Sequence, residues 1–215
     1  NLYAALGMTI AIIGTILFHE DVNHATGEVH RIGNLPFIFG AIAIGTVVGY
    51  FAAMRVKMTA MPQMVSLFNG MGGACAALIS IVEMNTHHPV EFGQRFIIFL
   101  GLMIGTVSFA GSMIAYGKLE GKIRDIGSKV QQVTNNTMVF AILALIIFIS
   151  MGGSGTDWMI WIVFVASLVY GVLFVMPIGG ADMPVVISLL NSFTGIAAAL
   201  GGFMYDNQVM LTGGI

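Results

Sequence analysis

The stretch Gly179–Gly195, GGADMPVVISLLNSFTG, decides the fold of this chain. It begins as a loop does, with two glycines and a carboxylate, and continues without a break into an apolar helix that carries Asn191. Pro184 fits the first turn of such a helix, where a missing N–H costs nothing. Asp182 stands where an N-cap residue belongs, so we expect its side chain to cap the helix.

The composition around this stretch is that of a membrane protein. Of the 215 residues 57% are hydrophobic and 8% charged, and the mean hydropathy is +0.93. Soluble domains carry about 25% charged residues, three times as many. Eight basic and ten acidic residues give no basic patch, which argues against a nucleic-acid partner. The single cysteine, Cys75, excludes an internal disulfide.

Long apolar runs predict an all-α, polytopic transmembrane helix bundle in one domain over residues 1–215. About eight spans are expected, the last incomplete, and the short fifth run should extend toward Thr134–Asn136 and Ser154. The runs are Leu2–Phe18, Pro36–Met54, Pro62–Val82, Phe96–Gly117, Met138–Met151, Trp158–Val175, Pro184–Tyr205 and Val209 onward. Pairs of small residues four apart, such as Gly101 and Gly105, favour close helix packing.

The basic residues predict how the bundle is oriented. Six of the eight fall in the loops after the second and fourth runs, and only Arg31 and Arg95 fall on the other side. By the positive-inside rule those two loops, and the loop that carries Asp182, face the cytoplasm. The six residues are Arg55, Lys57, Lys118, Lys122, Arg124 and Lys129.

The opening stretch has a second copy earlier in the chain. Residues 61–78, MPQMVSLFNGMGGACAAL, and residues 183–200, MPVVISLLNSFTGIAAAL, share nine of eighteen positions without a gap. The copies fall on the third and seventh runs, which makes them parallel sequence repeats. Asn69 and Asn191 each lie seven residues beyond a proline, about 10 Å deeper along the helix. Both asparagines should therefore lie at one depth in the membrane.

Each asparagine shares a helix face with a serine three residues earlier, Ser66 for Asn69 and Ser188 for Asn191. One interpretation is a hydrogen bond that holds helices together, worth about 1 kcal/mol in membranes. The other is a polar stripe that holds water and lines a path. Both remain open at this point.

No Asp, Glu, His, Lys or Arg lies well inside any of the apolar runs. Glu83 lies at the outer end of the third run and Asp182 at the cytoplasmic mouth of the seventh. A proton relay normally uses buried titratable groups, so a partner helix or ordered water would have to bridge the gap. The outer segment HEDVNHATGEVH, at 19–30, fits no zinc motif, and NGMGGACAAL, at 69–78, lacks the strand and third glycine of a nucleotide loop.

Three motifs resemble the β subunit of proton-translocating NAD(P) transhydrogenase. They are KMTAMPQMVSLFNGMGG at 57–73, FAGSMIAYGKLEGK at 109–122 and GGADMPVVISLLNSFTG at 179–195. The resemblance implies that the chain is a membrane segment of a longer protein, truncated at both ends. It implies coupling of hydride transfer between NAD(H) and NADP(H) to proton passage, in a bacterial inner membrane or a mitochondrial one.

The resemblance also implies partners and cofactors outside this segment. NAD(H) and NADP(H) would be bound by separate cytoplasmic domains, the NADP(H) domain following residue 215. Membrane helices of an α subunit would pack against this chain, and the α/β unit would form a homodimer in the lipid bilayer. No hydride-transfer site, bound cofactor or metal is expected within residues 1–215.

The family pattern gives roles to particular residues. Its conserved aspartate matches Asp182 and its buried asparagine matches Asn191, whereas Asn69 replaces a histidine that some members use in the proton path. The predicted proton path is therefore Asn69, Asn191, Ser188, Ser66, Asp182 and Glu83. Asp182, Lys118, Lys122 and Arg124 would form the interface that docks and gates the soluble domains. A secondary transporter for a small solute and a structural membrane anchor are the alternative functions.

Overall fold

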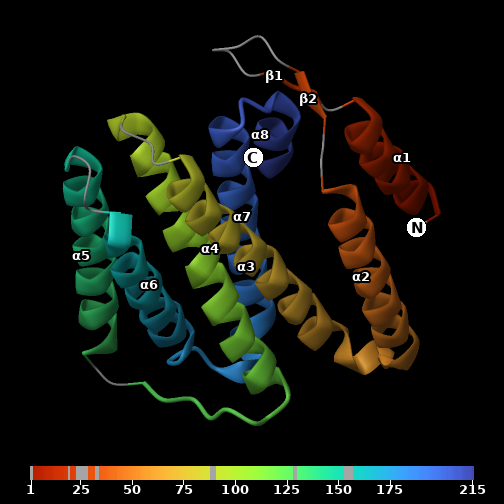
Figure 1. The fold of residues 1–215 in the computed structure, drawn as a ribbon. Coiled ribbons are helices and arrows are strands. Elements are labelled where there is room, and N and C mark those ends of the chain that lie inside the picture. The colour runs from red at the N-terminus through yellow and green to blue at the C-terminus, as the bar shows by residue number, and fades with distance from the viewer. Residues whose placement is uncertain are drawn as a thin grey trace. The chain divides into compact units, whose positions relative to one another are not determined.

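The computed structural model describes residues 2–18, 20–22, 29–31, 34–87, 91–127, 130–152 and 157–215. These residues are almost entirely helical, as expected (Figure 1). The chain divides into two compact units, residues 1–56 and residues 57–215.

The first unit consists of two apolar helices and a short hairpin. Helix α1 is Leu2–Phe18 and helix α2 is Leu35–Arg55. Between them, strands β1 (Glu20–Val22) and β2 (Val29–Arg31) pair antiparallel, with Asp21 opposite His30. The hairpin departs from the all-helical expectation, and its valines are of the type enriched in strands. His19 and His24 lie outside the described residues.

The second unit is a helical bundle around α4 (Phe92–Leu119), which contacts α3, α5, α6 and α7 (Figure 1). The other helices are α3 (Met61–His87), α5 (Gln131–Met151), α6 (Ile160–Val175), α7 (Met183–Met204) and α8 (Gln208–Gly214), with three-residue 3₁₀ turns η1 (Met58–Ala60), η2 (Asp157–Met159) and η3 (Gly180–Asp182). Helix α5 begins earlier than the apolar run did and takes in Thr134–Asn136; Ser154 lies outside the described residues.

Five described helices are long and apolar enough to cross a membrane: Leu35–Arg55, Met58–Thr86, Phe92–Leu119, Gln131–Met151 and Gly180–Met204. Helices α1 and α6, with 17 and 16 residues, are shorter apolar helices. A helix of 16 residues extends about 24 Å, less than the hydrocarbon core of about 30 Å. Helix α8 has only seven residues. The described residues thus contain five helices of full spanning length, and the expected count of about eight, the last incomplete, is not confirmed by them.

Helices α3 and α7, which carry the two sequence copies, begin in the same way. Each follows a 3₁₀ turn closed by one backbone hydrogen bond, from Ala60 N to Lys57 O at 2.8 Å and from Asp182 N to Gly179 O at 3.0 Å. Both helices run in the same direction along α4. Near their beginnings they meet the last turns of α4, and at their far ends Tyr205 contacts Glu83.

The capping role expected of Asp182 is wrong in one respect. Asp182 occupies the N-cap position of α7, but its side chain makes no capping hydrogen bond. Its backbone is already helical, with φ −91° and ψ −1°, because η3 continues directly into α7. Pro184 also removes one of the N–H groups that an N-cap side chain would bind.

Candidate functional site

A polar cluster lies between α3 and α4, at the depth of Asn69. The buried face of α3 includes Ser66, Asn69 and Gly73, which recur at helical spacing. A Cβ added at Gly73 would lie 2.6 Å from the carbonyl oxygen of Gly105, so the two backbones touch. This close approach brings the polar side chains of α3 onto those of α4.

Asn69 is the centre of this cluster and is 8% exposed. Its Nδ2 donates to Ser112 Oγ at 3.0 Å and to Ser108 Oγ at 3.3 Å. Ser66, fully buried, donates from Oγ to the carbonyl oxygen of Ser112 at 2.8 Å. Asn69 Oδ1 is buried and has no hydrogen-bond partner among the described residues. A buried amide oxygen of this kind can accept one further hydrogen bond, from water or from a partner.

Ser108 extends the cluster from α4 to α7. Its Oγ donates to the carbonyl oxygen of Leu190 at 2.9 Å and lies 2.6 Å from Thr194 Oγ1. Thr194 also donates to Leu190 O at 3.2 Å. Either hydroxyl can be the donor between Ser108 and Thr194, so the direction of this hydrogen bond can reverse. Three helices are thus joined by a chain of amide and hydroxyl groups.

The two sequence copies have different surroundings. Helix α7 turns Val186, Ile187 and Leu190 inward, which leaves Ser188 and Asn191 on its exposed face. Asn191 makes no side-chain hydrogen bond with any described residue. The structure therefore brings Ser66 and Asn69 together, but it does not bring Asn191 and Ser188 to them.

Sequence reasoning missed Ser108, Ser112 and Thr194, which supply the actual partners of Asn69. A signal was present, because Ser108 and Ser112 are four residues apart in an apolar helix and share one face. Glycines border that face, and a helix face with glycines allows a neighbouring helix to approach closely.

A cavity of about 240 Å³ lies one turn beyond the cluster, between α3, α4, α7 and α8. Thr194 lines it, together with Gly72, Cys75 and Gly201. Its walls are almost entirely apolar, and apolar cavities stay dry. The cluster therefore does not continue into a polar channel on this side within the described residues.

Glu83 lies at the far end of α3, where it meets α7. Tyr205 OH donates to Glu83 Oε2 at 3.1 Å. Burial, and then the charge and hydrogen bond of Glu83, raise the pKa of Tyr205 to about 12. Glu83 is well removed from Asn69, four turns along the same helix.

The opposite end of the bundle, which we call the basic end, carries Lys118, Lys122, Arg124 and Asp182. Asp182, Lys122 and Arg124 are exposed, whereas the Lys118 side chain is only 1% exposed. Lys122 forms an ion pair with Glu120, and its hydrogen bond lowers the pKa of that carboxyl.

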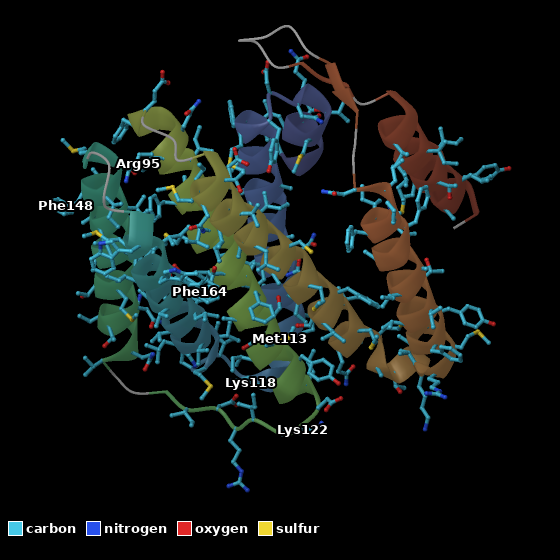
Figure 2. All side chains as sticks on the ribbon, viewed as in Figure 1. Arg95, Met113, Lys118, Lys122, Phe148 and Phe164 are labelled. Carbon is cyan, nitrogen blue, oxygen red and sulfur yellow. The ribbon has the colours of Figure 1, made fainter. Side chains whose placement is uncertain are left out.

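Arg95 was expected in the loop before the run Phe96–Gly117, and the structure corrects this. Helix α4 begins at Phe92, four residues before the apolar run does, so Arg95 lies in its first turn and is 1% exposed. Figure 2 shows Arg95 and Lys118 toward opposite ends of α4. The central helix thus has a buried cation near each end.

Among the described residues no three His, Cys, Asp or Glu side chains lie close enough to hold a metal ion. The buried polar groups are instead serine and threonine hydroxyls, the Asn69 amide and the two cations of α4. An apolar helical bundle with such an interior belongs to the class of polytopic membrane proteins.

Comparison with known proteins identifies the family. The family model of the NAD(P) transhydrogenase beta subunit matches residues 1–215, and the chain belongs to that family. Two curated relatives from Rhodospirillum rubrum, both named NAD(P) transhydrogenase subunit beta, are 33% identical over 224 residues. The match covers 100% of this chain and 46% of each relative. The chain thus spans about half the length of these relatives.

Proposed function

We propose that this chain is the proton-conducting membrane part of a proton-translocating NAD(P) transhydrogenase. The observation that carries the proposal is the chain of hydrogen bonds from Asn69 through Ser108 to Thr194. A proton can pass along hydroxyl groups when each one donates in one direction and then in the other. The cluster lies between α3, α4 and α7, where lipid cannot reach it. Its unpaired acceptor, Asn69 Oδ1, can therefore be satisfied only by water or by a polar group of a partner.

The cluster has no titratable side chain, so the proton donor and acceptor come from outside it. Asn69 Oδ1 has an unused acceptor position, and Asn191 presents an unpaired amide on the exposed face of α7. An amide facing hydrocarbon is unfavourable unless a partner covers it. We infer that membrane helices of an α subunit pack on this face and bring an ionisable group to the depth of the two asparagines.

The basic end is the proposed contact with the soluble domains. Lys122, Arg124 and Asp182 are exposed there, where NAD(H) and NADP(H) domains would dock on the cytoplasmic side of a bacterial inner, or mitochondrial inner, membrane. Asp182 would gate the mouth of α7, and Glu83 would lie at the exit. About eight spans, and a homodimer of the α/β unit, complete the proposed assembly.

The alternative of a solute transporter predicts a cavity shared by Asn69 and Asn191. Asn69 is buried between α3 and α4 while Asn191 is exposed on α7, so the two amides do not line one cavity. A purely structural anchor predicts that the hydroxyls of the cluster affect stability alone. The experiment below separates that alternative from proton conduction.

The test uses the complete complex in liposomes, with proton-coupled hydride transfer as the readout. Asp182→Asn, Asn191→Leu and Ser108→Ala should each depress coupled transfer, while hydride transfer between the isolated nucleotide domains continues. Ser150→Ala is the matched control, because Ser150 is also buried and, among the described residues, bonds only to Ile146 of its own helix, at 2.7 Å. Full coupled activity in the first three variants would refute the proposal.

A further inference from the structure

Lys118 is buried at the basic end of α4, with its ammonium group fully hydrogen-bonded. Its Nζ donates to Asp125 Oδ1 at 2.8 Å and to the carbonyl oxygens of Met176 at 2.6 Å and Ile178 at 2.7 Å. An ammonium has three N–H donors, and all three are used. Lys118 is therefore not available to bind a soluble domain, unlike Lys122, which is exposed.

These three bonds join two loops that are far apart in sequence. Asp125 belongs to the loop between α4 and α5, whereas Met176 and Ile178 belong to the loop that leads from α6 to Asp182. Backbone contacts reinforce the junction, because Ile126 N also donates to Met176 O, at 3.3 Å. The two loops therefore form one packed layer with the Lys118 ammonium inside it.

The carbonyl bonds are the inner part of this junction. The Asp125 side chain is 55% exposed, so water can replace its bond to Lys118. The carbonyls of Met176 and Ile178 have no such freedom, because a buried ammonium that lost them would be left with two unsatisfied N–H donors. The position of the α6–α7 loop is consequently tied to Lys118 more strongly than the position of Asp125 is.

We propose that Lys118 is a positioning residue that holds the α6–α7 loop against the α4–α5 loop and so fixes the place of Asp182. Ile178 lies four residues before Asp182, and the intervening turn is closed by the bond from Asp182 N to Gly179 O. A shift of the Met176 and Ile178 carbonyl groups would therefore also displace Asp182. The functional half of this inference rests on the proposed function: a domain that moves the α4–α5 loop would move the Asp182 carboxylate through Lys118.

Hydrogen–deuterium exchange of residues 176–182 in the complete complex tests the junction. Lys118→Met keeps the length of the side chain and removes the three bonds, so exchange in this segment should accelerate about tenfold or more. The protected amides of Ile178 and Asp182 are the reporters. Lys122→Met is the matched control and should leave the segment unchanged. Asp125→Ala, which keeps both carbonyl bonds, should accelerate exchange less, and it serves if Lys118→Met does not accumulate.

Proton-coupled hydride transfer, measured across pH on the same samples, tests the functional half. Coupled transfer should fall in Lys118→Met and stay normal in Lys57→Met, an exposed lysine before η1 that belongs to neither loop of the junction. Unchanged exchange in both Lys118→Met and Asp125→Ala would overturn the proposal outright. If Lys118→Met shows faster exchange but normal coupled transfer, while Asp182→Asn has lost coupled transfer, the positioning role is overturned. If Asp182→Asn is also fully active, the proposed function fails and only the junction between the loops stands.

Discussion

Replacing Gly73 with alanine should separate α3 from α4. The new Cβ would lie 2.6 Å from Gly105 O and 2.8 Å from Phe109 N, both rigid backbone atoms. Ordinary contact begins near 3.4 Å, so the helices must part by about 0.8 Å (3.4 − 2.6). Added to the 3.0 Å between Asn69 Nδ2 and Ser112 Oγ, this gives about 3.8 Å, which is too long for a hydrogen bond.

The expected cost follows from three contributions. Overpacking costs about 1–3 kcal/mol and the lost interhelical hydrogen bond about 1 kcal/mol, while the higher helix propensity of alanine returns about 1 kcal/mol. The net loss of about 1–3 kcal/mol should lower the Tm by about 2–12 °C, measured by thermal unfolding in detergent. Proton-coupled hydride transfer should fall as well, since Asn69 loses its nearer hydrogen-bond partner, Ser112.

Gly45→Ala is the control for this experiment. Gly45 lies in the middle of α2, and a Cβ added there meets nothing within 4 Å, so the Tm should stay the same or rise slightly. Equal Tm values for Gly73→Ala, Gly45→Ala and the unmodified protein would refute the backbone contact between α3 and α4. An equal fall in both variants would show that helical glycines matter here for a reason other than contact.

Three further outcomes are expected. Tyr205 should ionise near pH 12 in a spectrophotometric titration, and in Glu83→Gln its pKa should fall but stay above 10, because burial is the largest cause of the shift. Because the folded-state pKa is raised, the stability that the protonated phenol contributes is complete below about pH 10 and is lost between pH 10 and 12. Ser112→Ala should destabilise the protein by about 1 kcal/mol in detergent unfolding, because it removes the nearer hydrogen bond of Asn69. Lys122→Met should change thermal stability only at low salt, since its ion pair is exposed and salt screens it.

The sequence predicted the helical class, and it predicted that Ser66 and Asn69 share one helix face. Long uncharged runs with prolines in their first turns are local signals, and they placed the beginnings of α3 and α7 correctly. Ser66 and Asn69 were recognised because they recur as Ser188 and Asn191 in the second copy of the repeat, at helical spacing in both.

The other residues of the site could not be predicted, because their roles depend on which face each helix buries. A repeated sequence does not determine that face. Asn69 and Asn191 occupy equivalent positions, yet α3 turns Asn69 toward α4 whereas α7 turns Leu190 toward it. Ser108 and Ser112 were missed because two serines in a glycine-rich helix are unremarkable until a neighbour faces them. The buried state of Lys118 depends on the long-range contact with Met176, which no local pattern encodes.

The contact of Gly73 with Gly105 also bears on how the bundle can change shape. Backbone atoms have no rotamers to change, so α3 and α4 cannot rotate against each other at this contact without separating. The seam between α4 and α7 is different, because there the side chain of Leu190 fills the space beside Gly111 and can repack. Ser108 and Thr194 lie on this softer seam. A relative motion of α7 would therefore break the two hydrogen bonds of Ser108 to Leu190 and Thr194, and it would leave the bonds of Asn69 to α4 intact.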